Sequence, residues 1–424
     1  MTRARESLLR LPLIIPQPLE VRHAESAWGS GSLQSDQRAY ELLTTGRSML
    51  TLRLMIPPDD RHARDARRLF DGNRLRVARE LRGFSRLELG RLIKVSGAAV
   101  SQFEGGDARP ATRTLSQLAS VLVFPMEFFK KDAREPSLEC PAFFRSLRST
   151  SVNERRRARA FVEVVRQFAL GLARHVQFPE NDIPTFPAKP RTGRPEIERI
   201  AGEVRRAWSV PSTAPIQNMV ALIERHGAIT ARVAFDTEKL DAFSVPYEDF
   251  PVVILCSDKG KKDRSRFDVA HELGHLVMHA TTEAEAATKE TEQQAHQFAA
   301  AFLMPARGIR DELPATADWD QLLALKRKWG ASIASVLYRG RALNTMTEDE
   351  YVRATKAMSA RGWRVDEPSD LGAPESPVAL RRAVDLMAED GFSLDEIAAD
   401  TGLPFDQVER IVEAAAPTRH QVVV

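Results

Sequence analysis

The sequence predicts a mainly α fold with a small β-sheet: an N-terminal helical bundle, then an α+β domain, then a helical C-terminal segment. Three observations lead to this fold class. The 424 residues exceed what one hydrophobic core accommodates and indicate two or three domains. Apolar residues recur every three or four positions in most segments, as in amphipathic helices. Short apolar runs typical of strands gather between residues 228 and 256.

The first half of the chain predicts an extension, a small bundle and one long helix. Residues 1–65 contain a Gly-Ser repeat, scattered prolines and no sustained period, so we expect a poorly ordered extension. Residues 66–132 have the spacing of four short helices with tight turns. Residues 133–194 hold an amphipathic helix, 152–176, and a Pro-rich linker, 179–195. The apolar stripe of the long helix is Phe161, Val164, Val165, Phe168 and Leu172.

A second domain, 195–345, mixes helices with strands. We expect helices at 195–208, 215–226, 264–279 and 288–304, and strands at 228–233, 242–245 and 251–256. The C-terminal region, 346–424, contains a helical segment at 377–414. Within it, residues 393–412 have a second helix-turn-helix-like pattern with Gly402 at the turn, but their acidic charge favours a packing or substrate-presenting module.

The composition is that of a soluble globular protein, with 43% hydrophobic and 28% charged residues. No run of about 18 apolar residues exists, so we expect no membrane span. Pro12, Pro16 and Pro18 interrupt the apolar stretch near the start, which argues against a signal peptide. Cys140 and Cys256 are far apart and fit reduced thiols. We therefore expect a cytoplasmic protein.

Basic charge gathers in two segments, although the formal net charge is only +3. Residues 61–94 contain 11 Lys and Arg against 4 Asp and Glu, and residues 145–174 contain 8 against 2. A local basic surface is the electrostatic footprint of a DNA-binding face. A solvated helical face is the alternative explanation.

The segment HELGH at 271–275 predicts a metal site. On a helix, His271 and His275 are one turn apart and project from the same face, so both imidazoles can bind one ion. Glu272 lies beside the first ligand, where it can act on a water molecule held by the metal. Imidazole and carboxylate donors with one open position suit zinc, and we expect one zinc ion. A chance match on an amphipathic helix is the alternative.

The third ligand is expected from the helix at 288–304, which offers Glu290, Glu292 and His296. The apolar face of this helix is Ala295, Ala299, Phe302 and Leu303. Glu292 lies on that face, whereas Glu290 falls on a polar side with Gln294 and Gln297. A carboxylate on a buried face is costly unless it is paired or metal-bound, so Glu292 is the predicted ligand. His296 is a second-shell partner or an alternative ligand, and His279 a structural or second-shell group.

This ligand set implies hydrolysis of an amide bond. Zinc lowers the pKa of a bound water molecule and polarises the scissile carbonyl. Glu272 would take the proton and pass it to the leaving amine. The developing oxyanion needs a hydrogen-bond donor, for which Tyr338 and Arg266 are the candidates. An ordinary packing role is the alternative for Tyr338.

Residues 74–129 predict a helix-turn-helix motif. Ser85 and Glu88 have the spacing of a capping box that starts one helix. Residues 93–95 form a tight turn, and Ser96 caps the next helix, which carries Val100 and Phe103 inward. In this motif the second helix lies in the major groove of DNA. A small helical packing module without nucleic acid is the alternative.

The predicted DNA contacts divide into two kinds. Base edges would be met by exposed residues at the start of the second helix: Ser96, Gly97, Ala98, Ser101 and Gln102. Gln102 has the chemistry for a bidentate contact to adenine. Phosphates would be met by basic side chains, which position the protein without reading sequence: Arg86, Lys94, Arg109 and Arg113.

The same segment resembles the Cro/repressor-type (XRE) helix-turn-helix family. The resemblance rests on Arg76-x-Ala78-Arg79-Glu80, Gly83-Phe84-Ser85, Glu88-Leu89, Val95-Ser96, Val100-Ser101, Glu104-x-Gly106, Pro110 and Leu118-Ala119. Gly90 stands where the family usually has alanine, and we expect it to loosen helix packing. Arg86 replaces a common glutamine, which leaves the base preference open.

The second domain resembles the ImmA/IrrE family of metallopeptidases. The resemblance rests on RFDVAHELGHLVMH at 266–279 and EQQAHQFAAAFLMP at 292–305. It implies a zincin-like metallopeptidase fold, with zinc ligands at His271, His275 and Glu292 and the base at Glu272. His296 replaces a usual Asn or Asp, which is expected to perturb the third-ligand helix. Members of the family typically cleave a repressor protein.

Together these observations predict a transcriptional regulator with zinc-dependent endopeptidase activity that cleaves a repressor or antitoxin in a stress response. Double-stranded DNA and a protein substrate are the predicted partners, and assembly as a homodimer is expected of this type of DNA binder. Two alternatives remain open. In the first, the chain is a DNA-binding regulator whose zinc domain senses a ligand or stress without proteolysis. In the second, it is an antitoxin-like component of a toxin–antitoxin pair.

Overall fold

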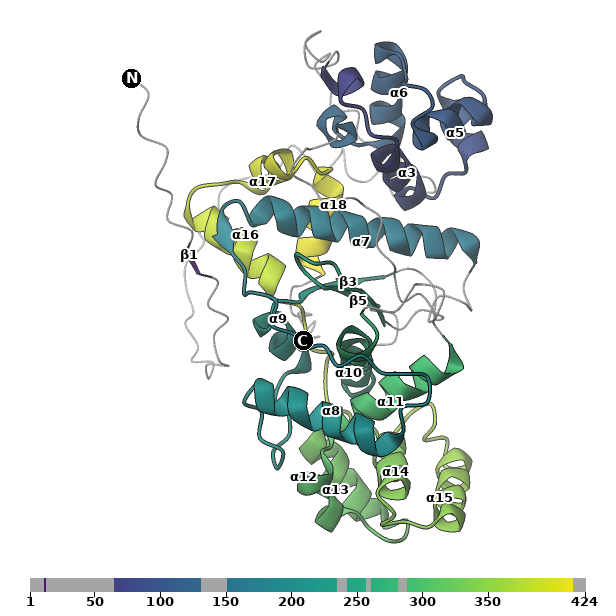
Figure 1. The fold of residues 1–424 in the computed structure, drawn as a ribbon, viewed down its shortest axis with the longest axis vertical. Coiled ribbons are helices and arrows are strands. Elements are labelled where there is room, and N and C mark those ends of the chain that lie inside the picture. Colours follow the sequence, from purple (N-terminus) through teal and green to yellow (C-terminus); the bar gives the residue numbers. More distant parts are fainter. Residues whose placement is uncertain are drawn as a thin grey trace, which may run out of the picture.

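A computed structural model describes residues 11–12, 65–130, 151–234, 242–256, 261–280 and 288–414 (Figure 1). Within these ranges the chain is mainly helical and contains one three-stranded sheet, which confirms the predicted fold class. A second pairing joins two-residue strands, β1 (Leu11–Pro12) and β2 (Val176–Gln177). Apart from residues 11–12 and 65, the predicted extension over 1–65 lies outside the described residues, as does Cys140.

The N-terminal bundle contains the four short helices that the spacing predicts, followed by a 3-10 turn. Their bounds are α3 (Gly72–Leu81), α4 (Arg86–Leu92), α5 (Gly97–Gly105), α6 (Thr112–Leu122) and η1 (Met126–Phe129). Ser85 and Glu88 form the predicted capping box of α4, and Ser96 accepts from the backbone N–H of Ala99 to cap α5. Leu75, Leu89, Val100, Leu115 and Leu118 are fully buried and form the core of the bundle.

Helix α7 (Val152–Leu172) lies between the bundle and the sheet (Figure 1). The predicted apolar stripe is fully buried at every position. The helix begins at a capping box of Ser151 and Glu154, and it ends four residues earlier than predicted because the chain turns at Ala173 and enters β2. One side of α7 therefore contacts α3, and another contacts β3 and β5.

The sheet separates two hydrophobic cores. Its strands are β3 (Ile229–Val233), β4 (Ala242–Val245) and β5 (Val252–Cys256), in the order β3-β5-β4. β5 pairs parallel to β3 and antiparallel to β4. Because side chains alternate along a strand, Val252 and Ile254 join the core with α7, whereas Val253 and Leu255 join the core with the helices that follow.

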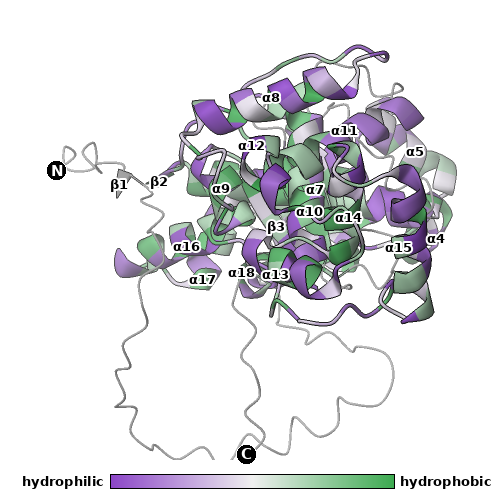
Figure 2. Ribbon diagram, turned by 90° about the horizontal axis from the view of Figure 1, so that it is seen from below, coloured by the Kyte–Doolittle hydropathy of each residue, from purple (hydrophilic) through white to green (hydrophobic). Residues whose placement is uncertain are grey.

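The second core is built by helices on the far side of the sheet. These are α8 (Arg194–Ala207), α9 (Met219–Arg225), α10 (Lys262–Met278), α11 (Lys289–Leu303), α12 (Ala306–Ile309), α13 (Trp319–Trp329), α14 (Ile333–Ala342) and α15 (Glu348–Ala360), with η4 (Arg310–Glu312) after α12. Most residues of α10 are buried, the polar residues Arg266, Glu272 and His275 among them, whereas α8 lies at the edge of the view in Figure 2 and alternates hydrophilic and hydrophobic segments. The predicted strands and helices of this region are confirmed within a few residues of their ends.

The C-terminal segment predicted at 377–414 is divided into three helices: α16 (Ala379–Glu389), α17 (Leu394–Thr401) and α18 (Phe405–Glu413). Gly391 and Gly402 adopt φ values of +91° and +68°, so the chain reverses after α16 and after α17. The three helices pack on α7 and β3. Arg82 at the end of α3 donates to both carboxylate oxygens of Asp406 and thereby joins the N-terminal bundle to α18. Among the described helices, none is both long and apolar enough to cross a membrane.

Candidate metal centre and nucleic-acid interface

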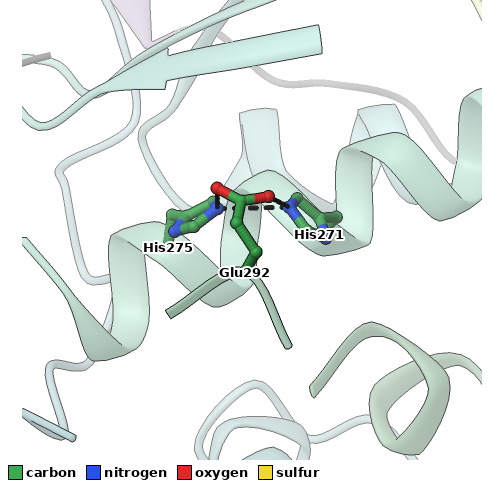
Figure 3. Close-up of side chains that lie close together, drawn as sticks. All are labelled: His271, His275 and Glu292. Atoms are coloured by element: carbon green, nitrogen blue, oxygen red, sulfur yellow. Dashed lines mark hydrogen bonds and ion pairs between the residues drawn. The ribbon is translucent and has the colours of Figure 1, made fainter. Parts of the chain in front are cut away.

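The two histidines of HELGH lie on α10 and project toward the same point. The Nε2 atoms of His271 and His275 are 3.1 Å apart. Glu292, in the first turn of α11, reaches between them (Figure 3). Its Oε2 lies 3.4 Å from Nε2 of His271, and its Oε1 lies 3.5 Å from Nε2 of His275. Within the described ranges, these three residues form the group whose donor atoms converge as metal ligands do.

These distances fit zinc. Nitrogen and oxygen donors held about 2.0–2.2 Å from an ion at tetrahedral angles are about 3.3–3.6 Å from one another. The three separations of 3.1, 3.4 and 3.5 Å lie near that range. Two imidazoles and one carboxylate leave a fourth tetrahedral position for water or substrate. Among the described residues, the donor set therefore has the chemistry and the spacing that a zinc ion with one open position requires.

A glycine at the helix crossing allows this convergence. Gly274 packs against α11, where a Cβ would lie 3.0 Å from Cδ1 of Phe298 and 3.3 Å from the Cα and carbonyl oxygen of Ala295. Ala295 lies one turn after Glu292 on the same helix. The missing side chain therefore lets α11 approach α10 closely enough for Glu292 to reach the two histidines.

Glu272 is buried beside the first ligand and is held by the sheet. Glu272 is 4% exposed. The hydroxyl of Ser244 on β4 donates to its Oε2 over 2.6 Å. Burial raises the pKa of Glu272 to about 7, although the charge of His271 and the hydrogen bond from Ser244 oppose this shift. A carboxyl group with a pKa near neutrality can both accept and return a proton.

The surroundings of the histidines are electronegative. Burial lowers the pKa of His271, but the hydrogen bond to Glu292 and the charges of Glu272, Glu292 and Asp268 outweigh it, so the pKa is raised overall. Negative charge around two imidazoles favours a cation in the same place. The electrostatics thus agree with the distances in favouring a metal ion.

His279 and Gln294 lie behind the predicted ligands. Nδ1 of His279 is 3.0 Å from Nδ1 of His275, and Nε2 of His279 is 3.0 Å from Oε1 of Gln294. Burial lowers the pKa of His279, which favours its neutral ring. The prediction that Gln294 lies on a polar side of α11 is wrong: the residue is 4% exposed, because α11 packs against α10 and the linker before α8 on that side.

The linker also contacts α10, the helix that carries His271 and His275. The backbone N–H groups of Phe186 and Ala188 donate to the carbonyls of Val277 and Met278 over 2.7 and 3.0 Å. These carbonyls belong to the last turn of α10, where no intrahelical partner follows. Residues of the Pro-rich linker thus satisfy two terminal carbonyls of the helix that carries both histidines.

His296 and Tyr338, the other two residues predicted near the site, pack against each other. His296 is exposed, and its ring packs against Phe267 and Tyr338 at centroid distances of 4.8 and 5.3 Å. It does not join the convergent group, and α11 runs unbroken through it, so the expected perturbation of this helix is wrong. Tyr338 is half-buried beside His296, with the guanidinium groups of Arg194 and Arg341 over its ring, and stays a prediction as oxyanion donor.

Arg266 has a structural position instead of the predicted role as an oxyanion donor. It is 3% exposed, and its guanidinium pairs with the Glu375 carboxylate and donates to the carbonyls of Ile216 and Gln217. Glu375 in turn accepts from the backbone N–H groups of Met219 and Val220, at the start of α9. Arg266 thus ties α10 to the C-terminal region, and these contacts do not support the oxyanion assignment.

The N-terminal bundle forms the predicted helix-turn-helix geometry. Lys94 adopts a φ of +58° in the turn between α4 and α5. A Cβ on Gly90 would lie 2.8 Å from the carbonyl oxygen of Val95 and 3.1 Å from the backbone nitrogen of Gly97. The expectation that Gly90 loosens helix packing is therefore wrong, since its missing side chain lets the turn pack directly on α4.

The predicted DNA contacts differ in exposure and in partners. Ser96, Ala98 and Gln102 are exposed on α5, whereas Gly97 and Ser101 are half-buried. Lys94, Arg109 and Arg113 are exposed basic residues around this helix. Arg86 is half-exposed, but its Nε donates to the buried Glu104 over 2.7 Å, and Glu104 is also paired with Arg79. This pairing competes with a phosphate contact by Arg86, and all nine assignments stay predictions.

Two residues of the site were not found by sequence reasoning. Ser244 could have been noticed as a hydroxyl within an apolar strand, but its contact with Glu272 depends on how β4 lies against α10. Gln294 is two residues from Glu292, and a strict apolar-face argument placed it on the wrong side. In both cases, the only sign in the sequence of a role at the site is a polar side chain on a helix or strand that packs against α10.

Comparisons with known families agree with both resemblances. Residues 223–340 match the model of the IrrE N-terminal-like domain, a peptidase family, and residues 72–127 match the model of a helix-turn-helix domain. These matches lie within the predicted boundaries 195–345 and 66–132. No curated protein matches the chain. From its N-terminus to its C-terminus, the chain thus combines a segment similar to a helix-turn-helix domain with a segment similar to the IrrE-type peptidase domain.

Proposed function

We propose that this chain is a DNA-binding transcriptional regulator with zinc-dependent endopeptidase activity, which cleaves a regulatory protein such as a repressor or antitoxin in a stress response. The convergence of His271, His275 and Glu292 beside the buried Glu272 carries this proposal. The similarity of residues 223–340 to a peptidase domain supports the reaction class, and that of residues 72–127 supports DNA as a partner.

The roles of the residues follow from their positions. Zinc in this site would lower the pKa of a water molecule that it binds and would polarise a peptide carbonyl. Glu272 would accept the proton of the attacking water and transfer it to the leaving amine. Ser244 would hold one oxygen of Glu272, so that the carboxylate keeps its direction during this transfer. His271, His275 and Glu292 would hold the ion and leave one position for substrate.

The DNA-binding part of the proposal rests on α5 and the turn before it. Gln102 and the other exposed residues at the start of α5 would face base edges, and Lys94 would contact a phosphate. A regulator of this type is expected to bind double-stranded DNA as a homodimer. The peptidase segment would then act on a protein bound at, or recruited to, the same DNA.

The proposal is tested by removing the base while keeping the metal ligands. Cells expressing the native chain, Glu272→Gln or Glu290→Gln are exposed to DNA damage or oxidative stress, and new protein N-termini are identified by mass spectrometry. Glu290→Gln is the matched control, because it makes the same exchange at an exposed position of α11. The zinc content of each purified chain is measured in parallel.

We expect fragments with the native chain and with Glu290→Gln, and none with Glu272→Gln, at equal zinc content. The fragment would also identify the substrate. Equal fragment patterns in all three strains would remove Glu272 from the reaction. Bound zinc without fragments under either stress would instead favour a regulator whose zinc domain senses a signal.

A further inference from the structure

A chain of hydrogen bonds leads from His275 into the interior of the domain. It passes from Nδ1 of His275 to Nδ1 of His279, over 3.0 Å, and from Nε2 of His279 to Oε1 of Gln294, over 3.0 Å. His279 is fully buried, and Gln294 is 4% exposed. In such a chain, the proton positions of one member determine those of the next.

The direction of the Gln294 amide is determined by the linker. Its Nε2 donates to the carbonyl of Lys189 over 2.8 Å and is also within reach of the carbonyls of Pro190 and Thr192, at 3.4 and 3.5 Å. An amide flip would place Oε1 against these three acceptors and leave them without this donor. The side-chain oxygen of Gln294 must therefore face His279.

This direction determines which ring nitrogens carry hydrogen. Because Oε1 of Gln294 can only accept, Nε2 of His279 must donate. The neutral ring of His279 then has a lone pair on Nδ1, which accepts from Nδ1 of His275. Nε2 of His275 is left without hydrogen, and this atom faces Nε2 of His271 and Oε1 of Glu292.

We propose that Gln294 is a positioning residue of the metal centre: its amide oxygen sets the tautomer of His279 and, through it, that of His275, so that His275 presents the lone pair of Nε2 to the ion. The identity of the ion rests on the proposed function, but the tautomers exist without it. The linker carbonyls that orient Gln294 belong to the segment that joins α7 to the peptidase-like domain, so the geometry of this linker acts on the metal site through Gln294.

The experiment uses the full chain and three variants. Gln294→Met keeps the length of the side chain and removes both the acceptor for His279 and the donor to the linker. Gln294→Glu keeps an oxygen toward His279 and removes the donor to the linker, which separates the two functions of the amide. Gln293→Met is the matched control, because Gln293 is the exposed neighbour on α11. Circular dichroism establishes that each chain is folded.

Two properties are measured. Zinc affinity is determined by competition with a chromogenic chelator. The histidine tautomers are determined in the zinc-free chains by NMR of the imidazole nitrogens. We expect the native chain to carry hydrogen on Nδ1 of His275 and on Nε2 of His279. Gln294→Met should lose this pattern and bind zinc about tenfold more weakly or worse. Gln294→Glu should keep the tautomers and remain within a few-fold of native affinity.

The proposal is overturned if native His275 carries hydrogen on Nε2, or if folded Gln294→Met binds zinc as tightly as Gln293→Met. A native chain that binds no zinc would contradict the proposed function, and the tautomers of the zinc-free chain would then decide this inference alone. If Gln294→Met does not fold, the native tautomers decide the outcome: hydrogen on Nδ1 of His275 and on Nε2 of His279 supports the proposal, and hydrogen on Nε2 of His275 overturns it.

Discussion

Replacement of Gly274 by alanine tests whether the close crossing of α10 and α11 assembles the metal centre. The added Cβ would lie 3.0 Å from a ring carbon of Phe298 and 3.3 Å from the backbone of Ala295. Ordinary van der Waals contact with a Cβ begins at 3.4 Å. Because the Ala295 contact is with backbone, it can be relieved only by moving α10 and α11 apart, and these helices carry the two histidines and Glu292.

The expected magnitudes follow from this geometry. Overpacking of a buried contact costs about 1–3 kcal/mol. Exchange of glycine for alanine inside a helix stabilises by about 1 kcal/mol. The free energy of unfolding of the zinc-free chain should therefore fall by up to about 2 kcal/mol. A metal site must be held within about 0.5 Å of its productive geometry. A displacement of a few tenths of an ångström uses most of this tolerance, so we expect zinc binding to weaken by up to about tenfold.

Gly202→Ala is the control for this prediction. Gly202 lies within α8, and a Cβ there meets no atom within 4 Å. This variant should gain about 1 kcal/mol in the free energy of unfolding and keep native zinc affinity. Urea denaturation of the zinc-free chains and chelator competition give the two quantities. If Gly274→Ala is stabilised as much as Gly202→Ala and binds zinc like the native chain, the crossing does not determine the site.

Two further predictions concern contacts that the C-terminal region makes with the rest of the chain, at Glu224 and at Arg82. Burial raises the pKa of Glu224 to about 7 from 4.5, so the folded chain keeps a proton that the unfolded chain releases over this range. Its contribution to stability should decrease as pH rises from 4.5 to 7, by at most about 3 kcal/mol. Glu224→Gln can still accept from the backbone N–H of Val378. In this variant the free energy of unfolding, measured by urea denaturation, should depend less on pH between about pH 5 and about pH 8. An unchanged pH dependence would contradict the raised pKa of Glu224. Asp406→Asn should lower the free energy of unfolding by no more than about 1 kcal/mol, because the ion pair of Asp406 with Arg82 is partly exposed. It should nevertheless raise amide hydrogen exchange where α3 meets α18. Unchanged exchange there would show that the pair does not join these helices.

Features within one helix or one turn could be predicted from the sequence because their geometry is local. The spacing of His271 and His275 places both on one face of any helix. Ser85 and Glu88 form their capping box within one turn. Glu292 was predicted from the cost of an unpaired carboxylate on an apolar face, and the structure brings it to the histidines. Its role as a ligand stays a proposal.

Features that depend on how two elements pack could not be predicted in this way. Gly90 was expected to loosen the bundle, but it lies where the α4–α5 turn packs against the helix. Arg266 is a candidate oxyanion donor by its chemistry, but its guanidinium pairs with Glu375 of the C-terminal region. When two side chains are far apart in the sequence, their contact depends on how their helices or strands are placed relative to one another. Hydrophobic periodicity carries no information on this placement.

By itself, the sequence determined the order of the two functional segments, the faces of their helices and the pair of histidines that project together, because 3.6-residue periodicity and capping act within a few residues. Tertiary structure decided that Ser244 holds Glu272 and that Gln294 lies behind His279. The physical reason is close packing: the approach of α11 and β4 to α10 buries polar groups that must then find partners in one another.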